Sequence, residues 1–281
     1  MTKMSTNISA LQLISSRLPE YNISAVKTLL SNLSPQQDQL VLLPEDALCF
    51  ATKNDYMALA EPLGNGPYQN QLANLAKRYC CYLVCGSFPT KNKGDEKIHS
   101  TSLVFSPQGK LISYYHKIHL FDAMVDDKQA IYKESDTFIA GQALQLFDWK
   151  TAQGTYKVGL AICYDLRFPG LFQSLRAQGA DILLLPAAFT QVTGDAHWLP
   201  LLQARAIENQ CYVVAANQGG LHDNGKKTFG HSMVISPWGT VLDKVEMGAG
   251  FVCAPFSKVA IDKLRASMPV MIHNRFTSVL K

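Results

Sequence analysis

Apolar runs of strand length alternate with segments of helical periodicity along this chain, and this alternation restricts the fold more than any other feature. The runs LVLL, CYLVCG and CYVVAA are apolar at consecutive positions, as is typical of strands buried on both faces. Between such runs, apolar residues recur at helical spacing. This order of elements predicts an α/β fold. The predicted strands are 8–14, 38–45, 81–88, 181–189 and 211–217, and the predicted helices are 22–33, 67–80, 169–180, 197–210 and 257–268.

Hairpins interrupt the alternation and predict sheets of mixed direction. Residues 100–117 and 231–245 each contain two strand-like runs joined by a turn sequence. Asn22 is expected to cap the first helix. The segment 118–142 has no clear period, and irregular segments of this length inside compact domains are usually functional. No linker composition divides the chain, so we expect one domain over residues 1–281.

Composition excludes several classes of function. The net charge is only +4 and no basic block occurs, so nucleic acid is not an expected partner. The sequence contains no run of about 18 apolar residues, so no membrane span is expected. The N-terminus does not resemble a signal peptide. We therefore expect a cytoplasmic protein. Apart from Cys163, the cysteines are expected to be small buried side chains in a reducing compartment.

Three reactive side chains stand where predicted strands end. Glu45 follows QLVLLP, Lys117 follows KLISYYH, and Cys163 ends KVGLAIC. Ligands of open α/β sheets bind at the carboxyl ends of strands, so these groups could share one pocket. A carboxylate could take the thiol proton, and an ammonium could stabilise the oxyanion formed when sulfur attacks a carbonyl. The backbone N–H of Tyr164 would be a second oxyanion donor.

Each of these residues also has an ordinary structural interpretation. Taken singly, Glu45 and Lys117 fit solvated side chains, and Cys163 fits a small core residue. Only their joint position at strand ends favours covalent acyl transfer through a thioester.

Three segments resemble signatures of the nitrilase, or carbon–nitrogen hydrolase, superfamily: LVLLPE, YYHKIHLFD and VGLAICYDLRFP. The resemblance implies Glu45 as general base, Lys117 as the oxyanion-stabilising residue and Cys163 as nucleophile. A fourth segment, YKESDTFIAGQ, places Glu134 as a second active-site glutamate. The resemblance further implies a four-layer α-β-β-α sandwich of two mixed sheets with outer helices. Such proteins pack through an outer helical layer, so a homodimer or larger homo-oligomer is expected.

The segments RAIENQCYVVAANQ and GHSMVISPWGT resemble the branch that hydrolyses deaminated glutathione to 2-oxoglutarate and cysteinylglycine. The ω-amidases, which act on 2-oxoglutaramate, have similar segments and remain an alternative. A scaffold protein that has lost catalysis is a third hypothesis. A small carboxylated amide needs polar donors, and Arg167, Thr190, Thr193 and His197 are candidates because they follow strand ends.

Competing motifs are weak. Ser232 lies in GHSMV, in which Val234 replaces the second glycine of a serine-nucleophile motif. His116 and His119 have a three-residue spacing without a third ligand cluster, so no metal is expected. No motif for a cofactor is present, and we expect none.

Overall fold

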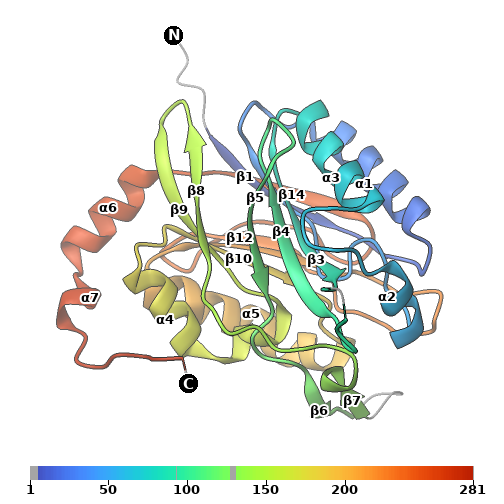
Figure 1. Ribbon diagram of the computed structural model, residues 1–281. Coiled ribbons are helices and arrows are strands. Elements are labelled where there is room, and N and C mark those ends of the chain that lie inside the picture. Colours follow the sequence, from blue (N-terminus) through green and yellow to red (C-terminus); the bar gives the residue numbers. More distant parts are fainter. Residues whose placement is uncertain (1–5, 93, 127–130, 281) are drawn as a thin grey trace.

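The computed structural model describes residues 6–92, 94–126 and 131–280, which contain two six-stranded sheets (Figure 1). The first sheet has the order β14 (Gly250–Pro255), β1 (Asn7–Gln12), β2 (Leu40–Leu42), β3 (Tyr82–Thr90), β4 (His99–Phe105) and β5 (Leu111–His116). The second has the order β13 (Val241–Lys244), β12 (Met233–Ile235), β11 (Tyr212–Asn217), β10 (Ile182–Ala187), β9 (Gly154–Leu160) and β8 (Leu146–Thr151). Both sheets mix parallel and antiparallel pairs, as predicted.

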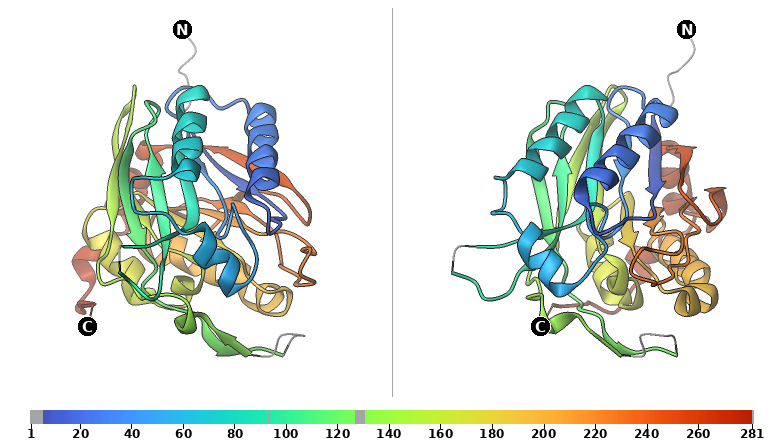
Figure 2. Two further views of the ribbon diagram at one scale, coloured as in Figure 1. Left: turned by 45° about the vertical axis from the view of Figure 1, so that its right-hand side comes forward. Right: turned by 90° about the vertical axis from the view of Figure 1, so that its right-hand side faces the viewer.

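Helices cover the outer face of each sheet (Figure 2). In the first sheet, α1 packs near β14, and α3 packs on β3 and β4; in the second, α4 and α5 pack on β9 and β11. The predicted four-layer α-β-β-α sandwich is therefore confirmed. The helices are α1 (Pro19–Leu33), α2 (Lys53–Leu59), α3 (Pro67–Arg78), α4 (Pro169–Ala177), α5 (Gln191–Asn209), α6 (Lys258–Ser267) and α7 (Val270–His273).

Three apolar cores lie between the four layers. Because successive strand residues point to opposite faces, Leu83 packs beneath the helices while Val84 faces the other sheet. Val213 and Val214 of the second sheet divide in the same way. Burial on both faces explains why these strands are apolar at consecutive positions.

Gly86 marks a close approach between the sheets. A Cβ on this residue would lie 2.2 Å from the Leu43 carbonyl oxygen and 2.3 Å from the Pro186 side chain on β10. Only glycine fits at this position. The Leu43–Pro44 backbone, which leads to Glu45, and Pro186 of the second sheet both lie too close for a side chain.

Some local predictions were wrong. Helix α1 begins at Pro19 in place of Asn22, because proline suits the first helical turn. The buried Asn22 amide instead binds backbone groups of Ser16 and Leu48. The helix predicted over 197–210 begins earlier in the structure: α5 starts at Gln191, with Thr190 as N-cap. Two cysteines expected to be buried are not: Cys80 is exposed and Cys253 is half-buried.

Short elements were missed. Helix α2 has a capping box at Thr52, and residues expected to be irregular contain the hairpin β6 (Asp122–Met124) and β7 (Ile131–Lys133). Residues 127–130 of that segment lie outside the described part of the chain. Two 3-10 turns, Glu134–Asp136 and Cys163–Arg167, carry predicted site residues.

Candidate active site

The two sheets together bring the predicted reactive residues to one place. Strands β3 and β5 are both antiparallel to β4, so β5 runs parallel to β2 and both end at the same edge. Lys117 directly follows β5, and Glu45 comes three residues after β2. Cys163 comes from the other sheet, three residues after β9. The site therefore lies between the sheets.

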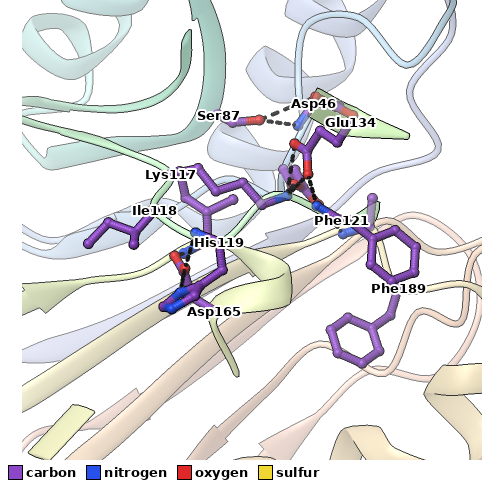
Figure 3. A network of polar contacts seen from close by, with 12 residues as sticks. Asp46, Ser87, Lys117, Ile118, His119, Phe121, Glu134, Asp165 and Phe189 are labelled. Carbon is purple, nitrogen blue, oxygen red and sulfur yellow. Dashed lines mark hydrogen bonds and ion pairs between the residues drawn. The ribbon is translucent and has the colours of Figure 1, made fainter. Parts of the chain in front are cut away.

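Lys117 is surrounded by two carboxylates. Its Nζ atom lies 2.8 Å from Glu45 Oε1. It also lies 3.0 and 2.8 Å from the two carboxylate oxygens of Glu134, as Figure 3 shows for these two side chains. The Lys117 side chain is only 2% exposed, and a buried ammonium is stable only when it is paired in this way. Phe121 N donates to Glu134 at 2.6 Å, and Ala188 N, just after β10, donates to Glu45 at 2.9 Å.

The pKa directions describe a charged Lys117 ammonium beside a neutral thiol. Burial works to lower the pKa of Lys117, but Glu134 and Glu45 outweigh it and raise the pKa well above its usual range. Burial, followed by Glu45, raises the pKa of Cys163, and Lys117 offsets this only in part. Glu45 lines the same cavity as Cys163 and is the charged group that raises the pKa of the thiol most. Glu45 can therefore accept the thiol proton as sulfur attacks.

Cys163 has a left-handed backbone, with φ of 46°. This conformation is uncommon outside glycine and asparagine, and it is held here by the surrounding structure. The next residue but one, Asp165, accepts a 2.8 Å hydrogen bond from Ile162 N, which closes the turn around the cysteine. The strained conformation thus fixes the direction of the thiol.

Asp165 also connects the cysteine turn to β5, the strand that ends just before Lys117. Its Oδ2 atom accepts a 2.8 Å bond from the Tyr115 hydroxyl. Its Oδ1 atom accepts bonds from His119 N at 3.1 Å and His119 Nδ1 at 2.7 Å, as Figure 3 shows. The carboxylate is fully buried, so these bonds replace its hydration.

A cavity of about 450 Å³ opens onto these residues, a size suited to a small ligand. It is lined by eight of the nine predicted site residues: Glu45, Lys117, Glu134, Cys163, Tyr164, Arg167, Thr190 and Thr193. The ninth, His197, does not line it. His197 lies exposed on α5, where its Nδ1 atom accepts a 3.2 Å hydrogen bond from Arg167.

Sequence reasoning missed several residues of the cavity wall. Asp46 accepts a 2.9 Å bond from the Tyr56 hydroxyl, and burial, then Glu45, raises its pKa to about 7. Its position next to Glu45 was the one available signal. The wall also contains Lys53, Lys133, Lys226 and Lys227, whose local sequences resemble ordinary polar surface.

The side chains of the competing motifs make hydrogen bonds to other residues of the protein. His116 Nδ1 binds the Thr101 hydroxyl at 2.8 Å, and His119 binds Asp165. Ser232 donates to Gln12 at 2.8 Å and is fully buried. Among the described residues, no group of three or more His, Cys, Asp or Glu side chains could hold a metal ion. No helix in the described ranges is long and apolar enough to cross a membrane.

Comparison with known proteins agrees with this geometry. The family model for carbon–nitrogen hydrolases matches residues 7–254, and the chain belongs to this family. It is thus a hydrolase of carbon–nitrogen bonds.

Individual members of known sequence or structure resemble this chain over most of its length. The chain is 41% identical to deaminated glutathione amidase from Yersinia enterocolitica over 98% of its own length and 94% of that protein. Its structure matches the NitFhit protein of C. elegans with a TM-score of 0.84 and 34% identity, covering 97% of this chain and 66% of that one. It also matches Nit3 of Saccharomyces cerevisiae, a nitrilase superfamily member, with a TM-score of 0.84, 28% identity and 97% coverage of both chains.

Proposed function

We propose that this protein is an amidase that hydrolyses deaminated glutathione to 2-oxoglutarate and cysteinylglycine. The contact that carries the chemistry is the 2.8 Å pair of Lys117 and Glu45 beside the neutral Cys163 thiol. The substrate follows from the Yersinia relative, which is named for this activity and aligns over nearly the whole chain.

In the proposed reaction, Cys163 Sγ attacks the carbonyl carbon of the scissile amide while Glu45 takes the thiol proton. The carbonyl oxygen becomes an oxyanion, stabilised by the Lys117 ammonium and the Tyr164 N–H. Glu45 then passes the proton to the departing amine of cysteinylglycine, which leaves a thioester. Water, deprotonated by Glu45, attacks the thioester and releases 2-oxoglutarate and the thiol.

Glu134 is proposed to position Lys117 through its two contacts with the ammonium. Arg167 is proposed to bind the carboxylate of the keto acid, together with the N-terminal end of α5. There the Thr190 hydroxyl accepts from Thr193 N, and the helix dipole favours an anion. His197 would then act indirectly, by holding the Arg167 guanidinium.

Intact-mass spectrometry after mixing with substrate tests the mechanism. We expect a 2-oxoglutaryl adduct in the wild type, or in a slow Glu134 variant, and none in Cys163→Ala. Glu45→Gln should lower turnover about 10²- to 10⁴-fold through loss of the general base. Substantial turnover by Cys163→Ala would refute the proposal.

Two alternatives have their own tests. A higher kcat/KM on 2-oxoglutaramate than on deaminated glutathione would identify an ω-amidase. A scaffold protein would show no faster reaction of Cys163 with a thiol probe than of the exposed Cys80.

We further propose a single cytoplasmic domain over residues 1–281 that forms a homodimer or larger homo-oligomer. Apolar side chains on the outer surface of the α5 layer support this: Ile207 is 53% exposed, and it lies against Gly239, which follows Trp238, a side chain that is 69% exposed. Light scattering of the purified protein would give the number of copies, and a monomer would contradict the proposal.

A further inference from the structure

The cavity wall carries an excess of positive charge. Among the residues that the structure describes, three acids line it, and two of them, Glu45 and Glu134, are paired with Lys117. The third, Asp46, is bound by the Tyr56 hydroxyl. Five further cations face the same cavity, which favours an anionic ligand with more than one negative group. They are Lys53, Lys133, Arg167, Lys226 and Lys227.

Two of these cations lie at opposite ends of a row of aromatic rings. The ring centroids of Tyr164 and Phe121 are 4.9 Å apart, and those of Phe121 and Tyr132 are 5.0 Å apart. The Arg167 guanidinium lies 5.9 Å from the Tyr164 ring at one end. The Lys226 ammonium lies 5.9 Å from the Tyr132 ring at the other. Tyr164 directly follows Cys163, so the nucleophile lies near the arginine end of the row.

Lys226 differs from the other lysines of the wall. It is partly buried, whereas Lys53, Lys133 and Lys227 are exposed. Its ammonium also lies 5.8 Å from the Phe50 ring, so rings from two segments distant in the sequence lie near it. Its backbone is fixed as well, because its carbonyl accepts from His222 N at 2.9 Å. A cation held in this way is better ordered for binding than a lysine that moves freely in water.

The proposed substrate has two carboxylates: one belongs to the keto-acid part and the other to the dipeptide part. With the keto-acid carboxylate at Arg167, the scissile amide lies at Cys163 and the dipeptide extends along the aromatic row. We propose that Lys226 binds the carboxylate of the leaving dipeptide and so selects amides whose amine part ends in an acid. This rests on the proposed function, and it defines what separates such a substrate from 2-oxoglutaramate, which releases ammonia.

Lys226→Gln tests this with two substrates. A hydrogen bond to a charged group changes affinity by about 10- to 100-fold, so kcat/KM for deaminated glutathione should fall by that factor, mainly through KM. For 2-oxoglutaramate, which has no second carboxylate, kcat/KM should stay at the wild-type value. That unchanged activity also shows that the variant is folded. Lys226→Arg should restore most of the loss, and the matched control Lys227→Gln should change kcat/KM by less than about threefold.

A substrate variant completes the test. Deaminated glutathione with its glycine carboxylate capped as an amide should be a poorer substrate for the wild type by the same factor. In Lys226→Gln, capping should cost nothing further, because the partner is already absent. An equal loss on both natural substrates, or an equal effect of Lys227→Gln, would overturn the role of Lys226.

The proposed function fails in a different way. If the wild type does not hydrolyse deaminated glutathione at all, the substrate assignment is wrong and the Lys226 assignment is refuted with it. A fully active wild type with a uniform loss in Lys226→Gln refutes the assignment of Lys226 alone.

Discussion

Replacement of Asp165 by asparagine should destabilise the protein and misplace its nucleophile. The carboxylate accepts four hydrogen bonds, from Ile162 N, the Tyr115 hydroxyl, His119 N and His119 Nδ1, all between 2.7 and 3.1 Å. Asparagine offers one oxygen and one NH2 group, so one side of the carboxylate must be replaced by a donor. The site has no water-exposed direction in which that donor could turn, since Asp165 is 0% exposed.

The least costly orientation directs the NH2 group towards His119. The ring can then accept at Nδ1 by changing tautomer, but His119 N faces a donor and loses its partner. The remaining bonds also weaken, because the acceptor is no longer charged. One buried unpaired N–H and the lost charge assistance together give a loss of about 2–4 kcal/mol in the free energy of unfolding. The opposite orientation leaves Ile162 N unpaired and releases the cysteine turn directly.

Urea unfolding and alkylation kinetics measure the two effects separately. We expect a lower unfolding midpoint, a kcat reduced by about 10- to 100-fold, and slower reaction of Cys163 with iodoacetamide. Tyr115→Phe is the comparison variant: it removes one of the four bonds and also the hydroxyl that accepts from Ile118 N at 3.2 Å, and it should cost about 1–2 kcal/mol. An Asp165→Asn protein with the wild-type unfolding midpoint and kcat would refute the reasoning.

Three further predictions follow from the site and its surroundings. Glu134→Gln removes the charge that raises the pKa of Lys117 most, so this pKa should fall. The alkaline limb of the kcat/KM profile should then move to lower pH, and an unmoved limb would contradict this. For Asp46, the folded pKa of about 7 lies above the ordinary aspartate pKa of 3.8, so the folded state holds the proton more tightly. Wild-type stability should therefore fall as pH rises from about 4 to about 7. Asp46→Asn should flatten that slope in urea titrations at pH 5 and pH 8, and retention of the full slope would exclude Asp46 as its source. Gly86→Ala should lower the free energy of unfolding by about 1–3 kcal/mol in thermal melts, because the new methyl group meets backbone and Pro186 at the sheet contact.

The main strands were predictable from sequence because burial on both faces leaves a strong signal. Residues 82–90 and 182–187 are buried at every position, so their apolar runs mark strands without ambiguity. The start of α5 was not predictable in this way. Thr190, Thr193 and Gly194 resemble a loop, and only the tertiary contacts of Gly194 against Phe229 show why a glycine is needed inside the helix.

The site was predictable only in part, for a physical reason. Strand ends identified Glu45, Lys117 and Cys163, but spacing alone cannot show that Cys163 approaches the other two from a second sheet. That approach depends on how two sheets pack, which no local pattern encodes. Lys226 carries no signal at all in the sequence, because its position between aromatic rings depends on segments distant along the chain.

The division of the site between the sheets has a consequence for the chain cut in two. A break near residue 140 would leave Glu45, Lys117 and Glu134 on one fragment and Cys163 on the other. The C-terminal fragment would also carry β14, which pairs with β1 of its counterpart. Each fragment alone would be catalytically inactive. Hydrolysis would begin only when the fragments reassociate through the pairing of β14 with β1. The two fragments would thus form a complementation pair, in which amide hydrolysis reports that the fragments have associated.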